Sequence, residues 1–218
     1  MKVFLDHRLS GLDRMDTENT AILAIHWQVD VVEPQGAMGI FHEAIKQLRV
    51  VENTAAVIVA CRKLGMPIVY VNVCYQPGYP ELVRNNGLFN TMPKMGCLVR
   101  GTPGANVIAR LAPQPGDYII EHSRISSFFG TDLDTILRSL QIRTVICTGI
   151  ATNVAVDHTI RDAVQYGYDA ILLQDCCCSS TAEYHEAGLK TLQVLATQVT
   201  DSHAFFAAIG QPVETVAC

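Results

Sequence analysis

Two histidines, His26 and His122, each stand at the end of a short apolar run of the kind that forms a buried strand. An imidazole titrates near neutrality and can donate or accept a proton, so two of them in one site suit acid–base chemistry. If both runs belong to one parallel sheet, their carboxyl ends lie at the edge where such sheets bind ligands. We therefore expect His26 and His122 to share a pocket. The alternative is a decayed site in which both rings only pack and form hydrogen bonds, without a role in catalysis.

The segment Gly149–Ala155 joins another apolar run to a stretch of helical period. Backbone N–H groups at a helix start lack partners and carry positive potential, so this turn is able to hold an anion or an oxyanion. An ordinary tight strand–helix turn explains the same spacing, and both interpretations stay open. Neither G-x-G-x-x-G nor a P-loop GK[ST] is present, which disfavours nucleotide binding.

Short apolar runs alternate with helical stretches, which predicts a single α/β domain over residues 1–218, with a parallel sheet flanked by helices on both faces and an N-terminal arm over 1–18. The expected strands are Thr20–His26, Pro67–Val73, Asp117–His122, Arg143–Gly149, Asp169–Asp175 and Thr197–Asp201. The expected helices are Ala44–Leu64, one opening near Thr131, one from near Thr152 to Gly167, and Glu183–Leu195. The stretch Tyr75–Pro115 has little periodicity and is expected to be a long functional loop over the sheet.

The composition excludes several classes of protein. A net charge of −5 predicts no nucleic-acid partner and no anionic membrane surface. No apolar run approaches the roughly 20 residues that span a bilayer, and the N-terminus does not resemble a signal peptide, so we expect a cytoplasmic location. With 49% hydrophobic and only 17% charged residues, we expect a large core and a surface partly buried in a homo-oligomer, a dimer or tetramer.

Eight cysteines are present, and we expect them to be reduced thiols rather than a disulfide framework. The adjacent Cys176, Cys177 and Cys178 at a strand end are a weaker candidate for a displaced nucleophile, because nothing nearby in sequence lowers a thiol pKa. No paired C-x-x-C, H-x-x-H or H-E-x-x-H spacing supports a metal site. We expect no metal and no cofactor.

Four blocks carry a resemblance to a known family, namely Pro77–Glu81, Gly101–Ala105, Ser126–Leu133 and Gly149–Ala163. In this order, and over roughly Thr20 to Asp201, the chain resembles the isochorismatase-like hydrolases, the cysteine hydrolase superfamily. The resemblance implies a flavodoxin-like parallel sheet and an oligomer. It also implies hydrolysis of an amide or related C–N bond of a small molecule by an Asp–Lys–Cys triad, whereas true isochorismatases cleave a vinyl ether without the cysteine.

The three triad positions of this resemblance carry other residues. The aspartate position falls on His26, the lysine position on His122 and the nucleophile position on Ala155. An alanine forms no thioester, so the standard covalent route is excluded at this position. The resemblance further implies a cis peptide bond before Ala151 and an oxyanion hole formed by the backbone N–H groups of Ala151 and Ala155.

We therefore predict a hydrolase that acts on a small polar amide, carboxylate or enol ether, with His26 and His122 as the acid–base pair. The alternatives are a pseudoenzyme that binds a small ligand or a partner subunit, and a metal-dependent enzyme that uses the two histidines. Asp30 is a candidate to orient His26, and His158 a weaker candidate to face the site. The expected substrate-binding residues are Trp27, Gln28, Tyr75, Phe89, Arg124 (for a substrate carboxylate) and Phe128. Core packing explains the four aromatic residues equally well, and a structural salt bridge is the alternative for Arg124.

Overall fold

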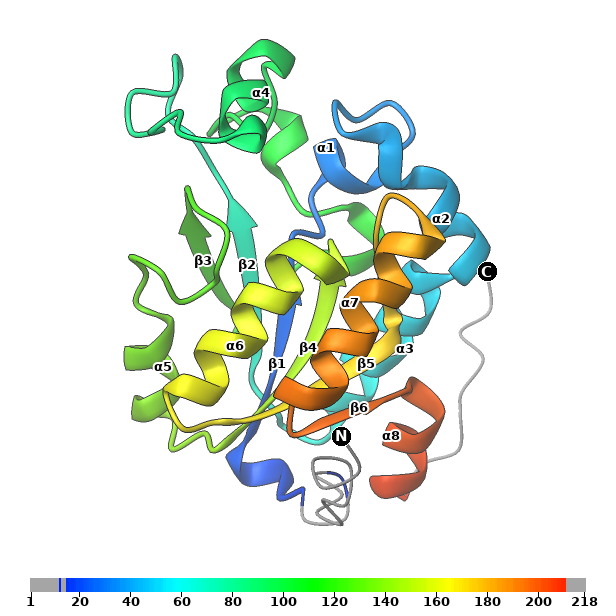
Figure 1. Ribbon diagram of the computed structural model, residues 1–218. Helices are drawn as coiled ribbons and strands as arrows, with labels where there is room; N and C mark the ends of the chain where they lie inside the picture. Colours follow the sequence, from blue (N-terminus) through cyan, green and yellow to red (C-terminus); the bar gives the residue numbers. More distant parts are fainter. Residues whose placement is uncertain (1–11, 13–14, 211–218) are drawn as a thin grey trace.

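Within the described residues, six parallel strands form one sheet in the order β3-β2-β1-β4-β5-β6 (Figure 1). The computed structural model describes residue 12 and residues 15–210, so most of the predicted N-terminal arm lies outside the described residues. The order reverses between β1 and β4, which is the doubly wound order that binds ligands at the reversal point and differs from flavodoxin's own strand order. The strands are β1 Thr20–Ile25, β2 Ile68–Val73, β3 Tyr118–His122, β4 Thr144–Ile150, β5 Asp169–Cys178 and β6 Gln198–Thr200.

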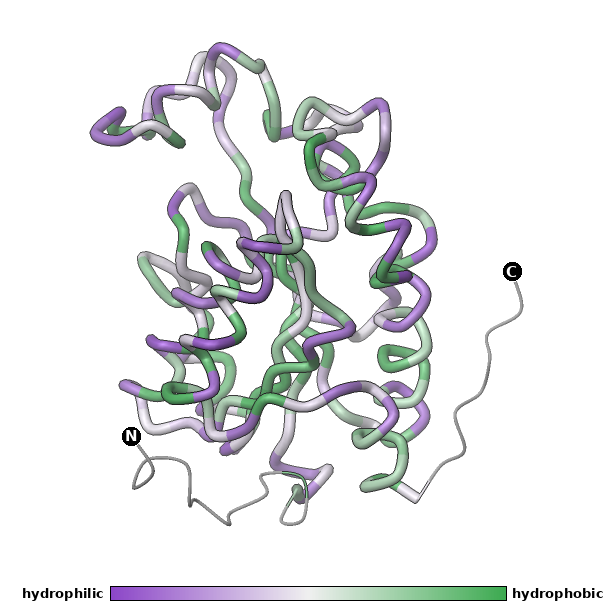
Figure 2. The backbone as a smooth tube through the Cα atoms, turned by 45° about the vertical axis from the view of Figure 1, so that its right-hand side comes forward, coloured by the Kyte–Doolittle hydropathy of each residue, from purple (hydrophilic) through white to green (hydrophobic). Residues whose placement is uncertain are grey.

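Helices cover both faces of this sheet, as predicted (Figure 1). The strands are mainly hydrophobic and the outer helices alternate in hydropathy (Figure 2), because a parallel strand covered on both faces buries every side chain. Helices α5, α6 and α7 bury Leu137, Ile160 and Leu192 against one face, whereas α3 and α8 bury Ile58 and Phe205 against the other. The helices are α1 Val29–Val32, α2 His42–Leu48, α3 Val50–Lys63, α4 Gly87–Met95, α5 Leu133–Ser139, α6 Asp157–Gln165, α7 Ala182–Leu195 and α8 Ser202–Ala208.

Three predicted elements differ from the observed ones. The single helix expected over Ala44–Leu64 is two helices, because Arg49 adopts a left-handed conformation (φ 53°) between α2 and α3. Strand β5 runs past Asp175 through the three adjacent cysteines. The expected loop Tyr75–Pro115 contains α4, which lies over the carboxyl ends of the strands (Figure 1). Among the described residues, no helix is long and apolar enough to cross a membrane.

Candidate active site

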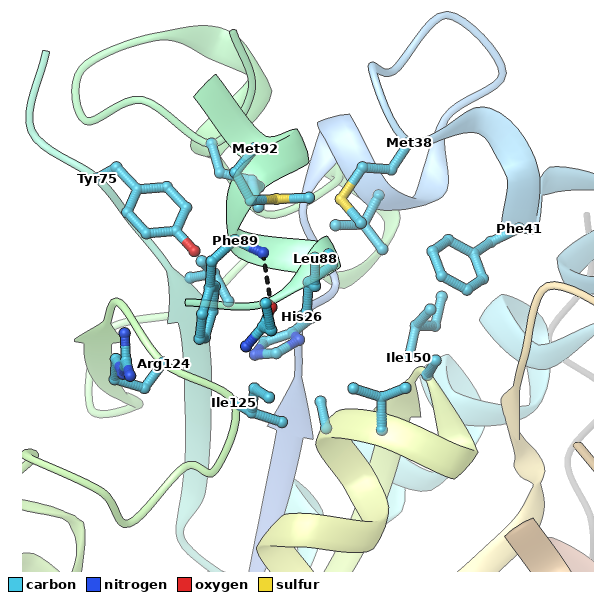
Figure 3. Close-up of a pocket in the computed structure, with 18 residues that line it drawn as sticks. His26, Met38, Phe41, Tyr75, Leu88, Phe89, Met92, Arg124, Ile125 and Ile150 are labelled. Carbon is cyan, nitrogen blue, oxygen red and sulfur yellow. Dashed lines mark hydrogen bonds between the residues drawn. The ribbon is translucent and has the colours of Figure 1, made fainter. Parts of the chain in front are cut away.

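A cavity of about 360 Å³ lies where the sheet order reverses, at the carboxyl ends of β1 and β4 and beneath α4 (Figure 3). Most of its lining is apolar, and the polar side chains are few. The lining residues are His26, Val31, Met38, Phe41, Val73, Tyr75, Asn86, Gly87, Leu88, Phe89, Met92, Leu98, Arg124, Ile125, Ile150, Ala151, Val154 and Ala155. This is the usual character of a small-molecule site: an apolar body with a few convergent polar groups.

The structure brings the two predicted histidines into direct contact. Their Nε2 atoms lie 2.8 Å apart, and the rings stack with centroids 5.1 Å apart at 28°. The contact crosses the end of β2, since His26 follows β1 and His122 ends β3. His26 lines the apolar cavity, while His122 lines a second, polar cavity of about 350 Å³. The pair therefore lies between the two cavities.

The backbone around His26 aims its ring at this contact. His26 has a φ of 57°, in the left-handed region where asparagine, aspartate and histidine are the side chains most often tolerated. Its N–H donates to the carbonyl of Val71 in β2, and the backbone then turns away from the sheet. Histidine thus fits the backbone at the position that the resemblance assigns to an aspartate.

The contact between the two rings requires one shared proton. At 2.8 Å one Nε2 atom donates and the other accepts, so only one of the two Nε2 atoms carries a proton in the neutral pair, and either ring is able to be the donor. His122 Nδ1 is buried and has no hydrogen-bond partner among the described residues.

Burial keeps both rings neutral at neutral pH. It lowers the pKa of His26 well below 6.5, with a smaller contribution from His122 and an opposing one from the Ile150 carbonyl. Burial also lowers the pKa of His122 to about 4, opposed by the backbone of Ser126. Two adjacent imidazoles in a low-dielectric site take up a first proton with difficulty and a second with greater difficulty.

We expect this pair to make the fold acid-sensitive. Between pH 6.5 and about 4 the unfolded chain binds protons that the folded His122 does not, so the free energy of unfolding falls as the pH drops. For His122 alone the loss is about 3 kcal/mol, and it is fully recovered above pH 6.5. Urea unfolding at pH 4.5 and pH 7.5 measures most of this loss. The His122→Asn variant, which lacks this titration, should lose about 2.5 kcal/mol less than the wild type between these two pH values. An equal loss in both proteins would contradict the lowered pKa of His122.

The turn after β4 carries the cis peptide bond that the resemblance implies. The Ile150–Ala151 peptide bond is cis, and one turn of π-helix over Thr152–Val156 leads into α6. Ala151 and Ala155 both line the cavity. The turn is anchored from outside, where Thr152 Oγ1 lies 2.8 Å from His185 Nδ1. His185 was not predicted, and its place in α7 gives no sequence signal for this contact.

Three of the predicted substrate-binding side chains, Tyr75, Phe89 and Arg124, line the cavity. The Arg124 guanidinium carbon lies 4.4 Å from the centroid of the Phe89 ring. The cavity roof also includes Met38, Phe41, Leu88 and Met92 (Figure 3). We did not predict these four residues, because they come from loops and a short helix without a distinctive pattern.

Three other predicted substrate-binding residues have structural roles, which corrects the sequence-based assignment. Gln28 is fully buried, donates to the carbonyls of Val73 and Ala105 and accepts the N–H of Val73. Trp27 is fully buried in the core on the α3 face, and its Nε1–H donates to Thr148 Oγ1 at 3.3 Å. Phe128 packs in the core on the other face.

The weaker candidates also lie elsewhere. Asp30 does not orient His26; its carboxylate accepts the backbone N–H of Leu98 at 2.7 Å and so fixes the loop beneath the roof. His158 is exposed, and its ring contacts the carbonyl of Val154. Cys176, Cys177 and Cys178 are fully buried, and burial raises the pKa of each thiol. None of these three has the lowered pKa that a nucleophilic cysteine needs.

The described residues contain no group of three histidine, cysteine, aspartate or glutamate side chains arranged to hold a metal ion. The two Nε2 atoms bind each other rather than converging on a third point. The contact therefore has the geometry of a hydrogen-bonded pair and not of two ligands of one cation.

The sheet order, the cavity at its reversal and the cis peptide turn define an α/β protein with a candidate small-molecule site. The chain matches the family described as the Isochorismatase domain over residues 20–204. It belongs to this family of isochorismatase-like hydrolases, which confirms the resemblance.

Solved structures support the same conclusion. A cysteine hydrolase from Pseudomonas syringae pv. phaseolicola 1448A is 27% identical with a TM-score of 0.82, and the match covers 90% of this chain and 94% of that one. An N-carbamoylsarcosine amidase from Thermoplasma acidophilum is 27% identical (TM-score 0.69; 84% and 96% covered). A nicotinamidase from Bacillus subtilis is 25% identical (TM-score 0.69; 84% and 100% covered).

Proposed function

We propose that this protein hydrolyses a small molecule without a covalent intermediate, with His26 and His122 as the acid–base pair. The observation that carries the proposal is the 2.8 Å contact between the two Nε2 atoms at a cavity that Ala155 also lines. Alanine supplies no nucleophile, so water must attack the scissile carbon directly. The class of bond is an amide, as in the relatives named for amidase activity, or an enol ether.

The proton balance of such a step suits the pair. At an amide, the oxygen of the attacking water bonds to the carbonyl carbon while one of its protons passes to His26; when the C–N bond then breaks, the same proton passes to the leaving nitrogen. In the resting pair the two Nε2 atoms bind each other, so the water competes with His122 for His26 Nε2. We expect the two rings to separate when substrate and water occupy the cavity.

Two backbone features support the charged states of this step. The N–H groups of Ala151 and Ala155 stabilise the oxygen that becomes negative as water adds to the substrate. The backbone of Ile150 stabilises the positive charge that His26 gains, since it raises the pKa of this ring. Both groups are fixed by the turn after β4 and need no rearrangement during the reaction.

We expect the activity to be independent of thiols. Burial raises the pKa of Cys61 and Cys147 to about 12 and that of Cys97 to about 11, which leaves them almost entirely protonated at neutral pH. A panel of nicotinamide, N-carbamoylsarcosine, other small amides and simple enol ethers should identify a substrate. Pretreatment of the native protein with iodoacetamide should then change the turnover rate less than twofold. Cys218, outside the described residues, is replaced by serine for this experiment.

Loss of turnover after alkylation, or a covalent adduct seen by mass spectrometry during turnover, would contradict the proposal. The binding-protein alternative also has a specific observation in its favour, because the two Nε2 atoms occupy each other in the resting state. It predicts saturable ligand binding in the same cavity with no product from any member of the panel. Product formation that disappears in His26→Asn would exclude it.

A further inference from the structure

Arg124 presents an unsatisfied positive charge to the candidate site. Its Nη1 atom is shielded from solvent and has no hydrogen-bond partner among the described residues. The guanidinium lies over the ring of Phe89 and lines both the apolar and the polar cavity. A shielded guanidinium N–H without an acceptor is costly, so such a group generally has a partner in the functional state.

Two carboxylates line the polar cavity together with Arg124, and both already have other partners. In the polar cavity, Glu121 pairs with Arg100 at 2.6 Å, and Glu81 accepts the backbone N–H of Gln76 at 2.6 Å. Arg161 likewise has its own carboxylate, Asp157, at 2.6 Å. Within the part of the chain that the structure describes, Arg124 forms no such ion pair.

The Tyr75 hydroxyl is a second polar group near this positive charge. Burial raises the pKa of Tyr75, and the positive charge of Arg124 opposes that rise, which places the phenol within electrostatic reach of the guanidinium. In Figure 3 the hydroxyl of Tyr75 points towards Phe89 and the centre of the site. An O–H and a guanidinium fork on one wall of an apolar cavity are the groups that bind a carboxylate.

We propose that the substrate is a small apolar monocarboxylate whose carboxylate binds Arg124, with its apolar body beneath α4. The reaction assigned to the site rests on the proposed function, whereas the carboxylate binding is a separate property of the cavity. The scissile group then lies beside His26, Ala151 and Ala155, which line the same cavity. The carboxylate binds and orients the substrate and is not the group that is hydrolysed.

Calorimetry at pH 8 tests this assignment without a known substrate. Cyclohexanecarboxylate serves as the probe and cyclohexylmethanol as its neutral match, since neither has a bond to hydrolyse. At this pH the histidine pair is neutral, so it adds no attraction for an anion. We expect the carboxylate to bind about 10- to 100-fold more tightly than the alcohol, as charge-assisted hydrogen bonds predict.

Four variants locate the interaction. Arg124→Met keeps the packing on Phe89 and should reduce this preference to less than threefold, whereas Arg124→Lys should retain part of it. Arg161→Met, which removes a cation that Asp157 already pairs and that lines neither cavity, should leave the preference unchanged. His26→Asn should also retain it, because the carboxylate does not bind to His26.

Equal binding of probe and alcohol by the wild type would overturn the assignment, and so would an undiminished preference in Arg124→Met. The first comparison needs no variant, so misfolding of Arg124→Met does not prevent the test. If the preference depends on Arg124 but the substrate panel gives no product, the carboxylate site stands and the proposed hydrolysis fails. If instead a neutral substrate is hydrolysed and Arg124→Met does not change its rate, the proposed hydrolysis stands and the carboxylate site fails.

Discussion

The His26→Asn variant is expected to hydrolyse the substrate about 10²- to 10⁴-fold more slowly than the wild type, the range that general acid–base catalysis contributes. Asparagine tolerates the left-handed φ of 57° at this position, so the backbone should be retained. The amide does not accept a proton near neutral pH, and the attacking water then has no base. The measurement is kcat together with the free energy of unfolding, which should change by less than about 2 kcal/mol.

His122→Asn supplies the matched comparison. Since the two rings act as one hydrogen-bonded unit, this variant should lose a similar part of the rate, and the double variant should lose little more than either single one. Losses that multiply in the double variant would mean that the rings act independently. Full turnover in both single variants would remove the pair from the mechanism.

The largest expected effect on stability is that of Gly149→Ala. Gly149 has a φ of 140°, and a Cβ atom built on it would lie 2.2 Å from the carbonyl oxygen of Ile25 in the neighbouring strand β1. This contact is with backbone, so β4 would have to move away from β1 at the edge of the sheet that carries the site. We expect a loss of at least about 3 kcal/mol in the free energy of unfolding, or failure to fold.

Gly96→Ala is the control for this prediction. Gly96 also has a positive φ, of 65°, but a Cβ atom there would meet nothing within 4 Å. Its cost should be only the roughly 1–2 kcal/mol of a left-handed alanine. Urea unfolding of both variants separates the cost of the clash with β1 from the cost of the left-handed conformation. Equal losses would show that the close approach of β4 to β1 does not affect stability.

Much of the fold follows from local patterns in the sequence. Runs that are apolar on both faces, such as Ala21–Ile25, predict central parallel strands, and Gly65 correctly marks the end of α3. The break at Arg49 was missed because neither glycine nor proline marks it. The extension of β5 was missed because Asp175 resembles a strand end, although its carboxylate is satisfied by Ser202.

The residues of the site that lie at strand ends were predictable from the sequence. The direction in which a neighbouring side chain points was not. His26 and His122 meet because parallel strands end at one edge of the sheet. Trp27 and Gln28 directly follow His26 along the chain, yet their side chains enter the core and a backbone network. Sequence proximity to a site residue therefore says little about access to the cavity. The predicted homo-oligomer and cytoplasmic location stay predictions.

Nitrogen-15 NMR of the histidine side chains tests the central claim, a proton held between two neutral rings, most directly. The signals of His26 and His122 are assigned by their loss in the two asparagine variants. We predict that at pH 7 both rings are neutral and that one Nε2 atom carries a proton while the other does not, with a scalar coupling across the Nε2–Nε2 contact and no titration of either ring near pH 6.5. Two uncoupled rings that each titrate near pH 6.5 would contradict the account.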